Sequence, residues 1–70
     1  MANKLYKEYT LVPRAEFDPR KEAWFVHVTI VWQVDSKVSF HTLHSPISFR
    51  TEKEAVAEGF RSAELWVDQR

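Results

Sequence analysis

Cysteine is absent from this 70-residue chain, and glycine and proline are scarce, with one and three residues. Without cysteine, neither a disulfide nor a thiolate metal site can form. A chain so poor in glycine and proline, with 44% hydrophobic residues, is unlike a disordered or low-complexity sequence. The lack of cysteine is typical of proteins in a reducing compartment, so we expect a soluble, cytoplasmic protein.

An excess of charge of either sign is also missing, because ten Lys and Arg residues balance ten Asp and Glu residues. Nucleic-acid-binding domains usually carry a basic excess, since phosphate contacts supply much of their affinity. No hydrophobic run approaches the ~20 residues of a membrane-spanning helix, and residues 1–4 have no apolar stretch of signal-peptide length. We therefore expect no membrane partner. Zero net charge removes self-repulsion and so favours association.

Aromatic residues are plentiful, at 14% of the chain. A domain of this size buries only about 60% of the surface of its unfolded chain, so it needs a dense core. Trp24, Trp32 and Trp66 can each bury a large area. Because no repeat or linker interrupts the sequence, residues 1–70 are expected to form a single domain.

Alternation of apolar and polar residues predicts the strands, since it is the pattern of a strand with one buried face. One strand is expected over residues 5–17, where Pro13 suggests an edge strand or a bulge. The clearest strand covers residues 23–34, in which every even position from 24 onward is apolar. A third strand is expected over residues 38–44. Residues 47–49 form a short extended piece that could pair as a fourth strand.

A C-terminal helix is predicted to start at Thr51, because Thr-Glu-Lys-Glu at 51–54 matches the capping box. Apolar residues then recur at helical spacing, at Val56, Phe60, Ala63 and Val67. Gly59 beside this stripe suggests that the helix backbone comes close to the sheet. The predicted fold class is α+β, an antiparallel three- to four-stranded β-meander followed by one helix packed on one sheet face, in the order ββ(β)βα.

The register between strands decides which side chains share the buried face. If Phe17 pairs with Trp24, odd positions of the first strand share a face with even positions of the second. A three-residue turn at 35–37 would add Val38 and Phe40 to that face, whereas a two-residue turn would direct them away from it. We expect the three-residue turn, because it keeps both residues in the core. The expected core is Leu11, Trp24, Val26, Val28, Ile30, Trp32, Val38 and Phe40.

The opposite sheet face, called the open face below, is one that a single helix cannot cover. It is expected to carry four apolar residues from three adjacent strands, Val12, Phe25, Val31 and Leu43, among polar neighbours. Contiguous exposed apolar residues usually mark an interface. The sequence therefore predicts a non-catalytic module that associates with itself or with another protein through the open face.

Weak, sequence-tolerant binding of nucleic acid is the alternative, because aromatic and basic side chains on a sheet can stack with bases. The residues for it would be Arg14, Phe25, His27 and His41. His27 and His41 are expected on the open face but several positions apart, and His44 on the other side, so no metal site is expected. No serine or carboxylate has a catalytic context, so we expect neither an enzyme nor a cofactor.

Residues 14–19, Arg-Ala-Glu-Phe-Asp-Pro, and residues 23–26, Ala-Trp-Phe-Val, resemble the first hairpin of HicB-like antitoxin domains. The helix start at residues 51–55 is similar to that of the family as well, so the resemblance covers about half of the chain. It implies a bacterial, dimeric β-sheet module that binds a partner protein. It assigns no functional residue.

Overall fold

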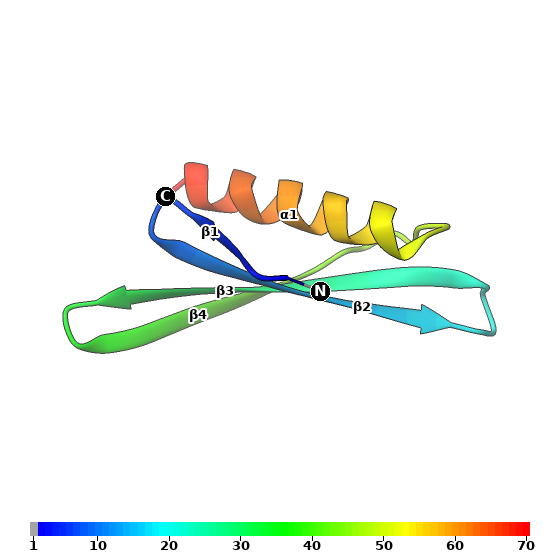
Figure 1. The fold of residues 1–70 in the computed structure, drawn as a ribbon, viewed down its shortest axis with the longest axis horizontal. Helices are drawn as coiled ribbons and strands as arrows, with labels where there is room; N and C mark the ends of the chain where they lie inside the picture. The colour runs from blue at the N-terminus through cyan, green and yellow to red at the C-terminus, as the bar shows by residue number, and fades with distance from the viewer. Residues whose placement is uncertain (1) are drawn as a thin grey trace.

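A computed structural model describes residues 2–70, which form one antiparallel sheet and one helix. The strands are β1 (Lys4–Tyr6), β2 (Tyr9–Asp18), β3 (Ala23–Val34) and β4 (Lys37–His44), in the spatial order β1-β2-β3-β4. The helix α1 (Glu52–Asp68) follows them and lies along one face of the sheet (Figure 1). The predicted α+β class, a meander followed by a C-terminal helix, is confirmed.

The expected first strand, residues 5–17, is two strands joined by a tight turn. The chain reverses at Lys7 and Glu8, whose φ angles are 49° and 68°. Positive φ at both central positions is the geometry of a type I′ hairpin turn. The prediction of one strand was wrong because Lys and Glu are not typical turn residues, so the pattern contained no turn signal. As a result, Leu5 lies opposite Thr10 in the β1–β2 hairpin.

The register between β2 and β3 is the expected one, with Phe17 opposite Trp24 and Leu11 opposite Ile30. Pro13 lies in β2 beyond Leu11, the last residue that pairs with β1. Successive residues of a strand direct their backbone groups to its two neighbouring strands in turn. Pro13 therefore directs its nitrogen to the same side as Leu11, toward β1, but β1 does not extend as far as Pro13. Of the two predicted alternatives, an edge strand or a bulge, the register shows no bulge at Pro13, which lies where β2 extends beyond β1 and is locally the edge of the sheet.

The turn between β3 and β4 contains only Asp35 and Ser36, and not the expected three residues. Asp35 has a φ of 58°, as the first central residue of a primed turn requires. Val38 and Phe40 consequently lie on the open face and are exposed, so their assignment to the core was wrong. A helix about 10 Å wide covers about two strands spaced 4.8 Å apart, which leaves β4 largely beyond its reach.

The connection from β4 to α1 runs back along β3. The Ser45 N–H donates to the Val26 carbonyl at 3.1 Å, which continues the ladder for one more residue. Phe49 and Trp24 exchange two backbone hydrogen bonds, of 2.7 and 2.8 Å. This contact is an isolated bridge, so residues 47–49 do not form a further strand of the sheet.

The start of α1 and its close approach to the sheet both follow the sequence. Thr51 caps the helix, because its Oγ1 accepts the Glu54 N–H at 3.1 Å. A Cβ atom added to the buried Gly59 would lie 2.8 Å from Val28 Cγ2 and 2.9 Å from Val26 Cγ2. Both predictions are confirmed. The core between α1 and the sheet consists of Leu11, Val26, Val28, Ile30, Ala55, Ala63 and Val67.

Trp32 lies at the margin of this core rather than at its centre. Its ring centroid is 5.4 Å from that of Tyr9 and 5.5 Å from that of Trp66 on α1. The Arg70 guanidinium lies over both indoles, 4.6 Å from the Trp32 ring and 4.8 Å from the Trp66 ring. This cluster holds the C-terminal end of α1 against β3 through aromatic and cation–π contacts.

Polar contacts attach the short strand β1 and the turn after it to the C-terminal half of α1. Lys4 pairs with Glu64 at 2.7 Å and Lys7 with Asp68 at 2.7 Å. The Tyr6 hydroxyl donates to both Asp68 carboxylate oxygens at 3.0 Å. The hydrogen bond from Lys7, followed by that from Tyr6, holds the pKa of Asp68 below its usual range. The same carboxylate raises the pKa of Lys7 and of Tyr6.

Candidate interaction surface

The open face is the face of the sheet that α1 does not cover (Figure 1). Residues directly opposite each other in antiparallel strands share a face, so the register assigns its members. They are Leu5 of β1, Thr10, Val12, Arg14, Glu16 and Asp18 of β2, Ala23, Phe25, His27, Thr29, Val31 and Gln33 of β3, and Val38, Phe40, Thr42 and His44 of β4. Among residues 2–70, no helix or strand lies over this face.

An apolar patch crosses the open face near the β3–β4 turn. Val31 lies opposite Phe40 on one side and Thr10 on the other, and Thr10 in turn lies opposite Leu5, so one row spans all the strands. We define the patch as Leu5, Val12, Val31, Val38 and Phe40. Leu5 is 73% exposed, Phe40 71% and Val38 68%, so large apolar side chains face solvent together.

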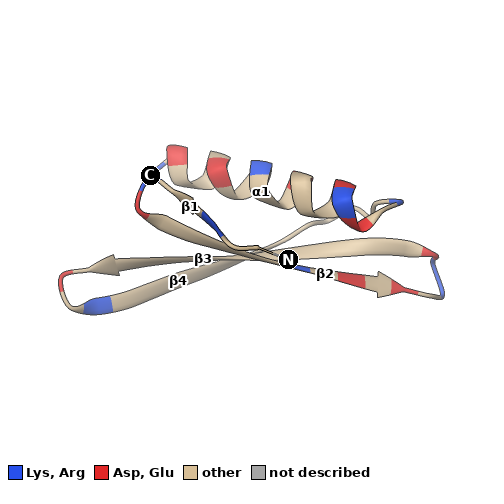
Figure 2. Ribbon diagram, in the orientation of Figure 1, with Lys and Arg blue, Asp and Glu red and all other residues tan. Residues whose placement is uncertain are grey.

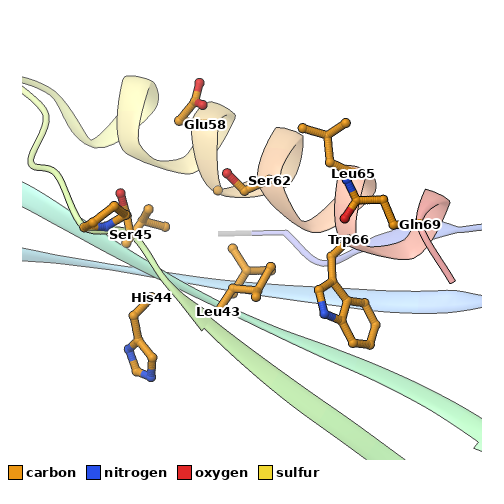
Figure 3. Close-up of a pocket in the computed structure, with 12 residues that line it drawn as sticks. Leu43, His44, Ser45, Glu58, Ser62, Leu65, Trp66 and Gln69 are labelled. Atoms are coloured by element: carbon orange, nitrogen blue, oxygen red, sulfur yellow. The ribbon is translucent and has the colours of Figure 1, made fainter.

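The patch includes only part of the interface predicted from the sequence. Val12 and Val31 belong to it, as expected. Phe25 lies on the open face but farther along β3, where the Lys21 ammonium sits 5.5 Å from its ring centroid. Leu43 is on the other face, opposite Val28, and it projects toward α1 (Figure 3). The prediction for Leu43 was wrong because the shorter turn reverses the face of every residue in β4.

The same reversal exchanges the expected positions of two histidines. His44, predicted on the helix side, lies on the open face opposite His27, with 2.6 Å between their Nδ1 atoms. At that distance one ring nitrogen donates a hydrogen bond and the other accepts it. His41, predicted on the open face, lies on the helix side and stacks on Trp66 at 4.8 Å and 9°. Within residues 2–70, no group of three or more His, Cys, Asp or Glu side chains could hold a metal ion.

The residues proposed for nucleic-acid binding are therefore only partly brought together. Arg14 lies opposite His27, and Phe25 lies one position farther along β3 on the same face. His41 is on the other side of the sheet. Arg14 Nε lies 3.4 Å from Glu16 Oε1, so a carboxylate offsets the single cation of this group. A phosphate backbone would meet little net positive charge here.

A groove on the helix side was not predicted. It runs between α1 and β4 and has a volume of about 340 Å³ (Figure 3). Its apolar lining includes Leu43 and Pro46 from the sheet side and Leu65 and Trp66 from α1. The groove exists because α1 packs over β2 and β3, so the flank of the helix nearest β4 stays partly exposed. A single register error concealed it, since Leu43 was placed on the other face.

In comparisons with known proteins, no family model matches the chain, and no curated protein or solved structure is significantly similar to it. Over residues 2–70, the single helix is too short and too polar to cross a membrane.

Proposed function

We propose that this protein is a non-catalytic interaction module whose open face binds another protein chain, either a second copy or a different protein. The observation that carries the proposal is the apolar patch, which spans all the strands and contains three large side chains that are mostly exposed. The outer face of an antiparallel sheet is usually polar where water covers it. A contiguous apolar patch usually marks an interface.

The charge distribution supports recognition by burial rather than by charge. Lys, Arg, Asp and Glu gather on α1 and in the turns, whereas the strands carry few of them (Figure 2). On the open face, Arg14 and Glu16 offset each other. Burial of the patch would contribute about 25 cal/mol per Å² of apolar area before the costs of association. Binding through such a surface should depend weakly on salt.

The hairpin that resembles HicB-like antitoxin domains supports the same proposal, because the resemblance implies a bacterial module that binds a partner protein. The absence of cysteine is consistent with a cytoplasmic location. Both are part of the proposal, and the open face is where a partner would bind.

A charge placed in the middle of the patch tests the proposal. Val31→Glu should abolish recovery of the partner chain, or lower the mass in solution if the partner is a second copy, while the circular dichroism spectrum is retained. Ala57→Glu is the matched control, because it adds the same charge to the exposed side of α1. If Val31→Glu unfolds, Phe40→Ser makes the same test at a more exposed position.

Unchanged mass and unchanged partners in a folded Val31→Glu protein would contradict the proposal. Gel mobility with single-stranded oligonucleotides at low and high salt tests the alternative function, which is the binding of nucleic acid. We expect at most weak binding that falls steeply with salt, since few phosphates can be neutralised. Tight oligonucleotide binding at physiological salt would instead favour the nucleic-acid function through Arg14, Phe25 and His27.

A further inference from the structure

Strand β4 is a free edge of the sheet. In a two-residue hairpin the residues that flank the turn form a hydrogen-bonded pair, so Lys37 and every second residue after it bond to β3. The hydrogen bond from Ser45 N–H to Val26 continues this series. The residues between them direct their N–H and C=O groups outward, and these are Val38, Phe40, Thr42 and His44. Within residues 2–70, no backbone group bonds to this outer side of β4.

The two edges of the sheet are protected to very different extents. On the β2 side, β1 covers part of the edge, and beyond it Pro13 offers no N–H group. Arg14 and Glu16 add charges to the exposed part of that strand. In contrast, β4 runs for eight residues without a proline, and its single Lys or Arg is Lys37 beside the turn (Figure 2). Natural proteins block free edges with such devices, because an unblocked edge is a template on which another strand can pair.

We propose that β4 pairs antiparallel with β4 of a second copy of this chain, which joins the two sheets into one. If the two-fold axis lies beside His41, every residue of β4 whose backbone groups point away from β3 is paired with such a residue of the second copy. Val38 then lies opposite His44 of the second copy, and Phe40 lies opposite Thr42 of the second copy. The same patch serves both chains, as a two-fold interface requires.

Charge favours a second copy as the occupant of this edge. In the antiparallel arrangement the two Lys37 side chains lie at opposite ends of the paired strands, about 27 Å apart at 3.4 Å per residue. That separation exceeds the Debye length of about 8 Å at physiological salt, so the two ammonium groups barely repel each other. The chain has no net charge that would oppose self-association.

This pairing goes beyond the proposed function, because it uses the edge of the sheet and leaves the open face of each copy uncovered. Side-by-side pairing brings the two apolar patches next to each other, since Val38 and Phe40 lie on the joined strands. A partner protein would then meet a patch about twice as large. The two proposals can therefore fail separately.

Thr42→Pro tests the edge, because it removes an outward N–H group that makes no bond to β3, and proline is tolerated where the N–H faces out of the sheet. Thr42→Ala is the control, since it keeps the N–H but loses the 3.2 Å contact with the Thr29 hydroxyl. Because the proposed dimer is two-fold symmetric, Thr42→Pro removes the hydrogen bond of this N–H group from both chains. We therefore expect the dissociation constant of the dimer, measured by sedimentation, to be about 30-fold higher or more in Thr42→Pro. Thr42→Ala should keep the mass of the unmodified protein. Val31→Glu should keep the dimer joined through β4, even where it loses a chain bound to the open face.

Hydrogen exchange on the unmodified protein makes the test independent of whether Thr42→Pro folds. We expect the amides of Phe40 and Thr42 to become protected as the protein concentration rises through the dimer dissociation constant. Fast exchange of both amides at every concentration, or a monomeric mass throughout, would overturn the pairing and leave the open-face proposal standing. The pairing would also be overturned if Val31→Glu dissociated the dimer and Thr42→Pro did not, because the two copies would then meet through the open face and not through β4.

Discussion

Replacing Gly59 by alanine should destabilise the protein, although alanine is the better helix former. Gly59 is buried where α1 crosses β3, and its φ is negative, so an alanine fits the backbone. The added methyl group would lie 2.8 Å from Val28 Cγ2 and 2.9 Å from Val26 Cγ2. Optimal carbon contacts are about 3.5–4.0 Å, so the helix or the valines must move.

Neither valine can yield easily. Val26 is 3% exposed and Val28 2%, and both lie in β3, which is paired on both sides. Their branched side chains have few alternative rotamers. Overpacking of this kind costs about 1–3 kcal/mol, whereas the gain in helix propensity is about 1 kcal/mol. The steric cost is larger than the gain in helix propensity, so the free energy of unfolding should fall by up to about 2 kcal/mol.

Urea unfolding followed by tryptophan fluorescence measures this change, and each kcal/mol should lower the melting temperature by about 4–8 °C. Ala57→Gly, on the exposed side of α1, is the control that isolates the propensity effect, which should cost about 1 kcal/mol. In a Val28→Ala background, which removes one of the two clashing methyl groups, Gly59→Ala should be less destabilising than in the unmodified protein, because only the 2.9 Å contact with Val26 Cγ2 remains. A stabilising effect in the unmodified protein would show that α1 does not approach β3 at this residue.

Two further predictions concern the ends of α1. Thr51→Ala should lower the free energy of unfolding by about 0.5–2 kcal/mol, because it leaves a helix-terminal N–H without its acceptor; an unchanged urea midpoint would place the helix start elsewhere. The pKa of Asp68 is lowered, first by Lys7, so its contribution to stability is present above the usual aspartate range and is lost as pH falls below about 4 toward the lowered pKa. Asp68→Asn should therefore be less stable than the unmodified protein at neutral pH and similar to it in acid, and an equal difference at every pH would refute the assignment.

Much of the fold was readable from the sequence because its signals are local. The alternation over β3 specifies a strand whatever lies beside it, and the Thr51 hydroxyl caps the helix within its own first turn. Gly59 marks the point of closest approach, since no other residue fits there without displacing Val26 or Val28. These features determined the α+β class and the side of β3 on which the helix packs.

The candidate site was predicted only in part, because it depends on turns whose residues carry weak signals. Lys7 and Glu8 adopt positive φ without being typical turn residues, so the β1–β2 reversal was not predicted and Leu5 was not placed on the open face. Val12 and Val31 were placed correctly because they depend on the β2–β3 register alone. Leu43 was not, because its position depends on the turn after β3.

The sequence by itself determined which segments are strands or helix and which face of β3 is buried, since period, caps and steric fit act between near neighbours. Only the tertiary structure decided which face of β4 meets the helix. A change of one residue in the turn at Asp35 turns every β4 side chain over, and burial in the core did not oppose it, because α1 is too narrow to cover β4. The exposure of Phe40, and with it the apolar patch and the open edge, follows from that geometry.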